Sequence, residues 1–406
     1  MHRVKLAALA ALVVTGGVHA QSNCAGDISG DGQVNGVDLA LVLTSWGVCQ
    51  ANPAIGGVYP PTGPAAGGTP IAIVGVDLGR TASVTIDGVI APQFSVVSGT
   101  TVTAVTPAGS AGARAIVLRD AQGQQIAAAA FNYFVSDLSW GTVLEQTPNP
   151  SVVTNASLRA SIMATGLPWR VRDNGTGIEM VLVPPGTFAM GAGADVTDPH
   201  WQELPVHSVT LTRAYYIARF ETTQVQWLAR AGSNPAWFHP PNVPTADLNR
   251  PVETVSWDAI NSFLAGSALR LPTEAEWEFA YRAGTTTEFH GFAGHPAGTA
   301  DEVLVPQIAW LGSNSGGQTH PVGQRLANGL GLCDMGGNVW EYCQDFFAGY
   351  SAESQIDPTG PSRPGGPVVR GGAYHDETSR ARASMRLPLL TTSAAPHVGF
   401  RVARNP

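Results

Sequence analysis

Two stretches of the chain carry side chains suited to binding a metal ion, and the first lies near the N-terminus. Oxygen-bearing side chains recur there at the spacing of a twelve-residue loop, at Asp27, Ser29, Asp31, Asn35 and Asp38. Gly32 occupies the sixth position, where the loop must turn sharply, and Gln33 would contribute its backbone carbonyl. Calcium takes six to eight oxygen ligands, so the pattern predicts an EF-hand-like calcium loop. A turn rich in Asp, Asn and Gly that binds no ion is the alternative.

The second stretch is His375-Asp376-Glu377, near the C-terminus. A facial metal centre needs one carboxylate and two imidazoles, and His320 or His397 would have to supply the second imidazole. On an extended segment, adjacent side chains point to opposite faces, so the three are not expected to converge. We therefore favour a solvated polar loop over a catalytic metal centre. The sequence contains no Gly-x-Ser-x-Gly, phosphate-binding glycine loop or His-Glu-x-x-His motif.

The elements that position these residues follow an export signal. Arg3 and Lys5 precede a short apolar run, and Val18-His-Ala20 predicts cleavage after the alanine. No later apolar stretch is long enough to cross a bilayer. We therefore expect residues 1–20 to be a signal peptide and the mature protein to be secreted, periplasmic or on the cell surface.

Four cysteines fall into two local pairs. Cys24 and Cys49 bracket the calcium loop, and we predict a disulfide between them, because an oxidising compartment permits it. For Cys333 and Cys343, a bridge and two buried free thiols both stay open.

Composition restricts the class of protein. Hydrophobic residues make up 44% of the 406 residues and charged ones 13%, which excludes a disordered chain. The net charge of −8 argues against nucleic acid as a partner, because phosphate binding needs clustered Lys and Arg. The 47 glycines and 30 prolines predict many turns and few long helices.

Residues 52–135 alternate like the strands of a small β-sandwich. Short runs such as Pro70–Val74 and Thr101–Val105 are separated by turn signals such as Asp87-Gly88. Pro60-Pro-Thr-Gly63 and Phe131-Asn-Tyr133 fall where an IPT/TIG immunoglobulin-like domain has similar landmarks, and the segment resembles that family. The resemblance implies a spacer or an adhesion module.

A long domain at 156–406 follows a polar stretch, 136–155, that we interpret as a linker. Its helices are predicted from their caps: Thr223 with Gln226, Ser256, and Thr273 with Glu276. The remaining sequence is rich in Gly, Pro and aromatic residues. We interpret five tryptophans as packing residues, with a place for one of them in the lining of a groove as the alternative: Trp140, Trp169, Trp201, Trp237 and Trp310.

Several motifs of this domain resemble the formylglycine-generating enzyme, or sulfatase-modifying factor, family. They are Gly177–Gly191, Phe220–Gln224, Arg270-Leu-Pro-Thr-Glu-Ala-Glu-Trp-Glu278, Gly331-Leu-Cys-Asp-Met-Gly-Gly-Asn-Val-Trp-Glu341, Arg370-Gly-Gly-Ala-Tyr374 and Gly399-Phe-Arg401, in the family's order. The resemblance implies an α+β fold of the C-type-lectin type. Residues 24–49 are similar to a single repeat of a type I dockerin, whose usual second loop is missing here; its partner stays open.

The family resemblance implies a second calcium site in the Gly331–Glu341 loop. The Asp334 and Glu341 side chains and the Gly337 and Val339 carbonyls would be the ligands. All four are hard oxygen donors, which suit calcium. Two surface carboxylates near a turn are the alternative.

The family's copper site is where this sequence departs from the pattern. The enzymes hold copper with two cysteines shortly after a Gly-Gly-Ser-Tyr motif, and copper(I) prefers soft thiolates. Here Asp376 and Ala381 occupy the two cysteine positions, and Ala373 replaces the serine. We therefore expect neither bound copper nor oxidation of a cysteine substrate.

Three functions remain for this chain. We favour a non-catalytic, calcium-binding module for an extracellular protein, peptide or glycan, with a groove formed by Arg370, Tyr374, His375, Asp376 and Arg382. An oxidoreductase of the same superfamily with another metal arrangement, such as a non-haem iron oxidase, is the first alternative. A receptor with a variable surface is the second.

Overall fold

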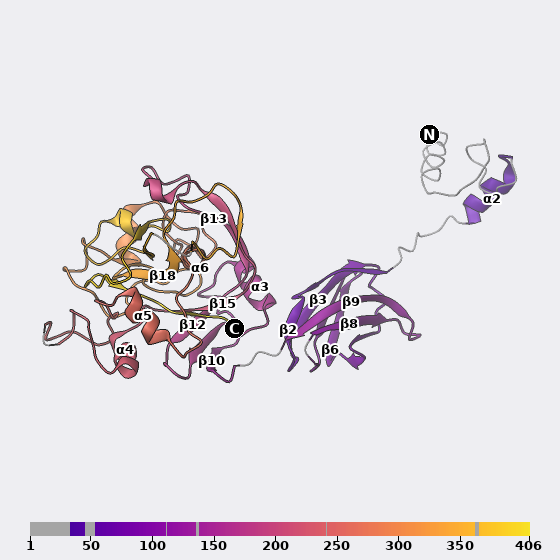
Figure 1. The fold of residues 1–406 in the computed structure, drawn as a ribbon. Helices are drawn as coiled ribbons and strands as arrows, with labels where there is room; N and C mark the ends of the chain where they lie inside the picture. The colour runs from indigo at the N-terminus through magenta and orange to yellow at the C-terminus, as the bar shows by residue number, and fades with distance from the viewer. Residues whose placement is uncertain (1–32, 45–52, 111, 135–137, 241, 362–364) are drawn as a thin grey trace. The chain divides into compact units, whose positions relative to one another are not determined.

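The computed structural model describes six stretches of the chain: residues 33–44, 53–110, 112–134, 138–240, 242–361 and 365–406. The chain divides into two compact units, Met1–Ala54 and Ile55–Pro406. The second unit contains a β-sandwich and a larger C-terminal domain (Figure 1). Each has its own hydrophobic core.

Helix α2 (Gly36–Thr44) belongs to the N-terminal unit. The helix begins at Gly36 because Asn35 caps it. The Asn35 side chain accepts the N–H of Val37 at 2.7 Å, and Asp38 Oδ2 accepts the N–H of Asn35 at 2.8 Å. Asp38 therefore lies in the first turn, with 3% of its surface exposed.

The predicted β-sandwich is confirmed as two sheets. One has the order β1 (Ala54–Tyr59), β3 (Pro70–Val76), β7 (Thr101–Val105), β6 (Gln93–Ser98); the other has the order β2 (Thr62–Pro64), β9 (Gln125–Phe134), β8 (Gly112–Arg119), β4 (Ser83–Ile86), β5 (Val89–Ile90). Successive side chains of a strand point to opposite faces. Alternate residues such as Ile71 and Ile73 of β3 are therefore buried in the core, along with Val84 and Ile86 of β4.

The C-terminal domain is built from several short sheets. The largest has the order β10 (Gly141–Glu145), β11 (Arg170–Asp173), β12 (Glu179–Val183), β15 (Tyr215–Ala218), β23 (Ala403–Arg404). A second has the order β21 (Arg386–Pro388), β20 (Pro367–Arg370), β18 (Trp340–Phe346), β22 (Val398–Gly399). The others are β13 (Gly186–Met190) with β14 (His207–Leu211) and β19 (Gln355–Ile356), and β16 (Ala309–Trp310) with β17 (Gly336–Gly337). The second sheet carries the candidate site.

We predicted 136–155 as a linker, but its described residues, 138–155, contribute to this domain. Strand β10 pairs with β11, and Gly141 lies opposite Asp173. Val153 is fully buried in the domain's core. We did not predict strand β10 from the sequence because the stretch is rich in polar residues. An edge strand needs only one apolar face, so such a composition is compatible with a strand.

The helices of this domain are short: α3 (Ala156–Ala164), α4 (Gln224–Ala231), α5 (Trp257–Leu264) and α6 (Glu274–Arg282), with 3₁₀ turns η1 (Trp201–Glu203), η2 (Glu302–Gln307) and η3 (Thr378–Ala381). The predicted caps are confirmed. Thr223 and Thr273 each form a full capping box, and Ser256 Oγ accepts the N–H of Ala259. The capping box at Thr273 thereby fixes the start of α6, and this end of the helix borders a cavity.

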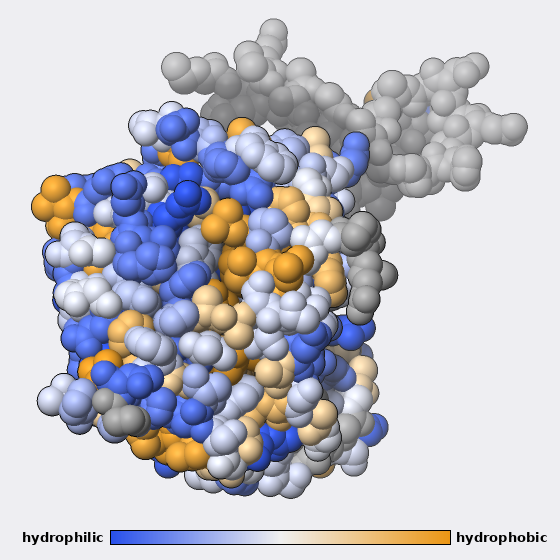
Figure 2. All heavy atoms as spheres, turned by 60° about the vertical axis from the view of Figure 1, so that its left-hand side comes forward, coloured by the Kyte–Doolittle hydropathy of each residue, from blue (hydrophilic) through white to orange (hydrophobic). Residues whose placement is uncertain are grey.

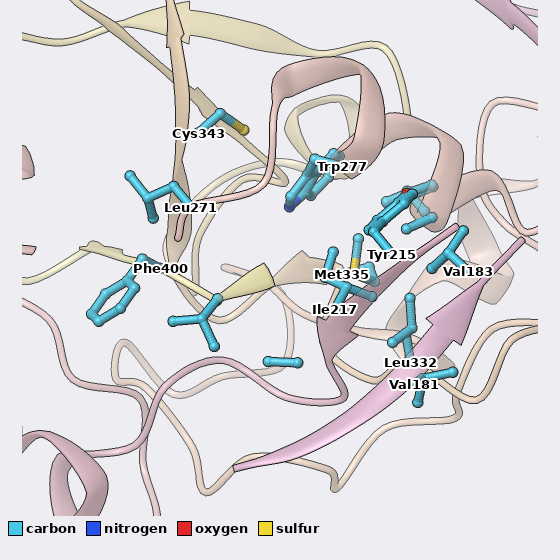
Figure 3. Close-up of a cluster of buried hydrophobic side chains, with 14 of the residues drawn as sticks. Val181, Val183, Tyr215, Ile217, Leu271, Trp277, Leu332, Met335, Cys343 and Phe400 are labelled. Atoms are coloured by element: carbon cyan, nitrogen blue, oxygen red, sulfur yellow. The ribbon is translucent and has the colours of Figure 1, made fainter. Parts of the chain in front are cut away.

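The core of the domain joins segments that lie far apart in the sequence (Figure 3). It packs Trp277 of α6 with residues of β12, β15, the loop before β18 and the segment after β22. Among them are Val181, Val183, Tyr215, Ile217, Leu332, Met335 and Phe400. Trp277 and Tyr216 are fully buried. Such burial stabilises each large side chain by about 1.5–3 kcal/mol, so α6 and β18 form a rigid base for the loops.

Cys333 and Cys343 are both buried free thiols. Burial raises the pKa of the Cys333 thiol to about 12, which keeps it protonated and unreactive. The packing role predicted for the tryptophans holds for Trp169 and is wrong for Trp201 and Trp237, which are 66% and 55% exposed.

On the face shown in Figure 2, apolar residues form separate groups among hydrophilic ones. Within the described stretches, no helix has the length and apolar character needed to cross a membrane.

Candidate functional site

The candidate site is centred on Asp376, in the turn between β20 and η3. Asp376 Oδ2 accepts two hydrogen bonds of 2.8 Å, from the indole N–H of Trp340 and from the backbone N–H of Ala373. The carboxylate therefore closes its own turn and ties it to β18. Ala381, at the end of η3, is 1% exposed and presents only a methyl group.

A row of neighbouring aromatic and imidazole rings lies next to Asp376. The ring centroids of Phe238 and Tyr374 lie 5.1 Å apart, those of Tyr374 and His375 5.0 Å, and those of His375 and His397 4.9 Å. His375 Nε2 lies 4.0 Å from Asp376 Oδ1, with 46% of the histidine side chain exposed. The segment is a turn and not the extended strand we assumed, so His375 and Asp376 do converge.

His397 was one of two histidines that we considered as a second imidazole, and the structure brings it to His375. Burial, and next to it the neighbouring His375, lower the pKa of the His397 imidazole. Even so, among the described residues no group of three or more His, Cys, Asp or Glu side chains is arranged to hold a metal ion. The ring of His320 stacks on Trp310, with their centroids 3.7 Å apart, and its Nε2 lies 2.7 Å from the carbonyl oxygen of Ser315.

A buried carboxylate that we did not predict holds one side of this surface. Glu253 is fully buried and accepts the N–H groups of Trp237 and Phe238 at 3.0 and 2.8 Å. Burial raises the pKa of the Glu253 carboxyl. Glu253 thus positions Phe238 against Tyr374 and leaves the Trp237 ring exposed.

Arg370 and Arg382, which we predicted to line the groove, do not reach the surface. Arg370 is fully buried, forms an ion pair with Glu278 and donates to the carbonyl of Ser384 at 2.7 Å. Arg382 Nε donates to the buried carboxylate of Glu203 at 2.8 Å. Sequence alone could not show this, because buried and exposed arginines have the same local pattern.

The Gly331–Glu341 loop contains the second group of candidate residues. Asp334 Oδ2 accepts the N–H of Gly323 at 2.6 Å, whereas Oδ1 is buried without a hydrogen-bond partner. Burial raises the pKa of the Asp334 carboxyl to about 6. Glu341 is held by Arg401 through two bonds of 2.6 Å and by the indole of Trp277 at 2.7 Å.

Glu221 joins these two carboxylates, and the sequence analysis missed it. Its carboxylate accepts the N–H of Val339 at 3.1 Å and the side-chain amide of Asn338 at 2.6 Å. Burial, followed by the charges of Asp334 and Glu341, raises the pKa of Glu221 well above its usual value. The loop thus contains two buried carboxylates, Asp334 and Glu341, and a third, Glu221, contacts it.

Comparison with known proteins identifies the family of the C-terminal domain. The family described as "Sulfatase-modifying factor enzyme 1-like domain" matches residues 164–406, more than half of the chain. The chain belongs to this family. The formylglycine-generating enzyme of Streptomyces coelicolor is 31% identical over 287 residues, which cover 55% of this chain and 88% of that protein. The enzyme of Thermomonospora curvata is 29% identical over 295 residues, covering 56% and 93%.

Solved structures agree with this sulfatase-modifying-factor fold. Treponema denticola variable protein 1 matches with a TM-score of 0.50 and 28% identity, over 56% of this chain and 95% of that one. PvdO from Pseudomonas aeruginosa matches with a TM-score of 0.50 and 25% identity, over 58% and 98%. The IPT/TIG family matches residues 53–133, which confirms the resemblance of the sandwich.

The sulfatase-modifying-factor domain of this chain does not fit the copper that its family implies. Asp376 offers a hard oxygen, already engaged by Trp340 and Ala373, where a soft thiolate is required. Ala381 offers no ligand atom. We therefore derive no step through copper.

Calcium fits the Gly331–Glu341 loop better. Asp334 has a buried oxygen without a hydrogen-bond partner, and the three carboxylates Glu221, Asp334 and Glu341 face two cations, Arg401 and Arg325. A divalent cation would offset the excess negative charge, and hard carboxylate oxygens suit calcium. Asp334 would supply a ligand together with the Gly337 and Val339 carbonyls, whereas Glu341 is already engaged by Arg401. The ion would stiffen the loop that carries Trp340.

The N-terminal calcium loop falls largely outside the described residues. Asp27, Ser29 and Asp31 lie there, as do Cys24 and Cys49. Gln33 lies in a bend, and Asn35 and Asp38 take part in the helix-capping bonds of α2. Calcium binding and the disulfide of this unit stay predictions.

Proposed function

We propose that this chain is an exported, calcium-binding protein whose sulfatase-modifying-factor domain binds an extracellular protein, peptide or glycan and does not oxidise cysteine. The binding surface is the aromatic and histidine surface formed by Phe238, Tyr374, His375, Asp376 and His397. The export signal at 1–20 and the calcium loop at 27–38 belong to the same proposal.

One observation carries the proposal most of all. At the two positions where the family's enzymes have copper-binding cysteines, this chain has a carboxylate and a methyl group. Asp376 is committed to Trp340 and Ala373, so the residue serves the turn and not a metal. The histidines next to it remain partly exposed and are available to a ligand.

The neighbouring surface supports binding. Trp237 is 55% exposed beside Phe238, and exposed aromatic side chains are enriched in binding sites. Glu253 fixes the backbone of both residues, so the surface is ordered before a ligand arrives. The IPT/TIG domain supports a modular role, as a spacer or an adhesion module.

Elemental analysis of the mature full-length chain, purified without chelator, tests the proposal together with an oxidation assay on a sulfatase-type cysteine peptide. We expect bound calcium, no stoichiometric copper or iron, and no turnover. The Streptomyces coelicolor enzyme serves as the positive control of the assay. Copper or iron with turnover would overturn the proposal in favour of the oxidoreductase alternative.

A receptor with a variable surface is a second candidate, favoured by the structural similarity to Treponema denticola variable protein 1. The structure restricts where such variation can lie. Arg370, Ala381 and Arg401 are buried, whereas His375, Glu377 and Leu390 are exposed. Sister sequences that vary only at exposed positions between Arg370 and Arg401 would support this candidate. Variation spread evenly over the chain would contradict it.

A further inference from the structure

A cavity of about 340 Å³ lies in the C-terminal domain, apart from the Asp376 surface. It forms where the start of α6, the end of β18 and the loop after β18 meet. Its volume is at the lower end of the roughly 300–1,000 Å³ that is typical of small-molecule sites. Trp340, at the start of β18, contacts Asp376, whereas Asp345 and Phe346, at its end, line the cavity. The two sites are thus separated by nearly the whole seven-residue strand, about 20 Å.

Asp345 is the acidic group that stands out in this cavity. Its side chain is 4% exposed, and Oδ2 accepts the N–H of Glu274, the first residue of α6, at 2.8 Å. Within the described residues, no Lys, Arg or His side chain forms an ion pair with it. Burial, and then the charge of Glu274, raise the pKa of the Asp345 carboxyl to about 8. A carboxyl group is therefore held in the wall without a compensating cation.

The other charges of the cavity are already matched. Arg386 donates to both oxygens of Glu274, at 2.6 Å each, and to the carbonyl of Ala348 at 2.8 Å. Tyr350 O–H donates to the same Glu274 at 3.2 Å, and the Arg386 guanidinium lies 4.0 Å from the centre of the Tyr350 ring. Arg386 therefore has little left to offer an anion, and Asp345 is the acidic group of the cavity that has no ionic partner among the described residues.

The lining also indicates which kind of cation fits. Calcium needs six to eight oxygens, whereas the carboxylates lining the cavity are Asp345 and Glu274, and Glu274 is already paired with Arg386. A primary ammonium carries three donors, which Asp345 and nearby oxygens can accept. Met190, Phe346 and Pro358 add apolar wall to the cavity, suited to a methylene chain.

The chain cannot readily fill this cavity itself. Its 406 residues include a single lysine, Lys5, which lies within the predicted signal peptide. We propose that the cavity binds the primary ammonium group of an aliphatic chain, as in a lysine side chain of another protein, with Asp345 as its ionic partner. This inference does not depend on the proposed role of the Asp376 surface and can fail without it.

Isothermal titration of the mature full-length chain tests the inference with two matched probes. Nα-acetyl-lysine amide carries the ammonium, and Nα-acetyl-norleucine amide replaces it with a methyl group. We expect the lysine probe to bind at least tenfold more tightly. A free diamine, cadaverine, distinguishes a small amine from a peptide lysine as the preferred source. Equal binding of the lysine and norleucine probes, or no binding of either amine, would overturn the inference.

Asp345→Asn removes the charge and keeps an oxygen that accepts the N–H of Glu274. We expect this variant to bind the lysine probe at least tenfold more weakly, with an unchanged or raised Tm. Glu353→Gln removes a charge from an exposed position and should bind like the wild type. Unchanged affinity in a folded Asp345→Asn protein would show that Asp345 is not the partner.

The pH dependence of binding gives a readout that a structural role would not produce. The charged and titratable groups around Asp345 are Glu274 and Glu276 of α6, His207 of β14, Tyr350 of the loop after β18, Arg370 of β20 and Arg386 of β21. Because Asp345 must ionise to pair with the ammonium, affinity should rise up to roughly tenfold per pH unit from pH 6 towards 8. Asp345→Asn should abolish most of this rise, and an equal rise in both proteins would contradict the assignment.

Discussion

The indole N–H of Trp340 donates to Asp376 Oδ2 at 2.8 Å and joins strand β18 to the turn after β20. The family resemblance predicts a copper-binding cysteine of the related enzymes at this position, where this chain has a carboxylate. The same oxygen also accepts the N–H of Ala373, so one side chain closes the turn and anchors it. These two hydrogen bonds give the Asp376 carboxylate a structural role in the turn.

Replacing Asp376 tests this anchoring role. Asp376→Ala leaves the Trp340 and Ala373 donors without their acceptor, and we expect a loss of about 1–3 kcal/mol in the free energy of unfolding. Asp376→Asn keeps one oxygen and should lose less. Urea denaturation measures both, and Glu377→Gln is the exposed neighbouring control. An Asp376→Ala protein as stable as the wild type would show that the turn does not depend on the carboxylate.

The ion pair of Glu341 and Arg401 supports the centre of the domain. Both residues are almost completely buried, and two bonds of 2.6 Å join them. Glu341→Gln leaves the Arg401 charge unpaired in the core, so we expect a loss of about 3–5 kcal/mol in stability. Thermal unfolding, compared with Glu353→Gln, measures the effect. A shift no larger than that of the control would indicate that Arg401 finds another acceptor.

Gly337 is required by its backbone geometry. Its φ is +76°, and an added Cβ would lie 2.2 Å from the carbonyl oxygen of Trp310. We expect Gly337→Ala to destabilise the domain by about 1–3 kcal/mol, because both the strained φ and the close contact must be relieved. Gly349→Ala is the matched control, since nothing lies within 4 Å of its added Cβ. Similar Tm values for the two variants would contradict this expectation.

Removal of calcium tests the Gly331–Glu341 loop. A ligand that binds only the folded state at 100 times its Kd stabilises it by about 2.7 kcal/mol, so chelation should lower the Tm by several degrees. Asp334→Ala should reduce the calcium-dependent shift, because it removes the free buried oxygen. The N-terminal loop is also predicted to bind calcium, so differential scanning calorimetry should follow the transition of the C-terminal domain. An identical shift in wild type and Asp334→Ala would place the effect elsewhere.

The raised pKa of the Asp345 carboxyl also predicts how the stability of the folded chain changes with pH. Its pKa is about 8 in the folded chain and close to 4 when unfolded, so the folded state binds the extra proton between these values. Stability should therefore fall as pH rises from 4 to 8, and Asp345→Asn should remove this part of the loss. We expect the variant to gain stability over the wild type by a few kcal/mol at pH 8 and little at pH 4. A gain that does not grow with pH would contradict the raised pKa.

The sequence determined the features that depend on neighbouring residues. Capping boxes at Thr223 and Thr273 need only residues three positions apart, and the alternation at Ile71 and Ile73 follows from the pleat of a single strand. Motifs of several residues, such as Arg270–Glu278, were enough to indicate the family. These signals are local, so they persist whatever the rest of the chain does.

Only the tertiary structure decided the roles of the charged residues. Arg370 pairs with Glu278 across 92 positions of sequence, and Glu221 reaches Val339 across 118. Nothing near Arg370 in the sequence distinguishes a buried guanidinium from one on a binding surface. The cavity beside Asp345 likewise forms from α6, β14, β18 and β21, which meet only in the folded domain. Burial and charge pairing are properties of distant segments brought together, and the sequence order does not contain them.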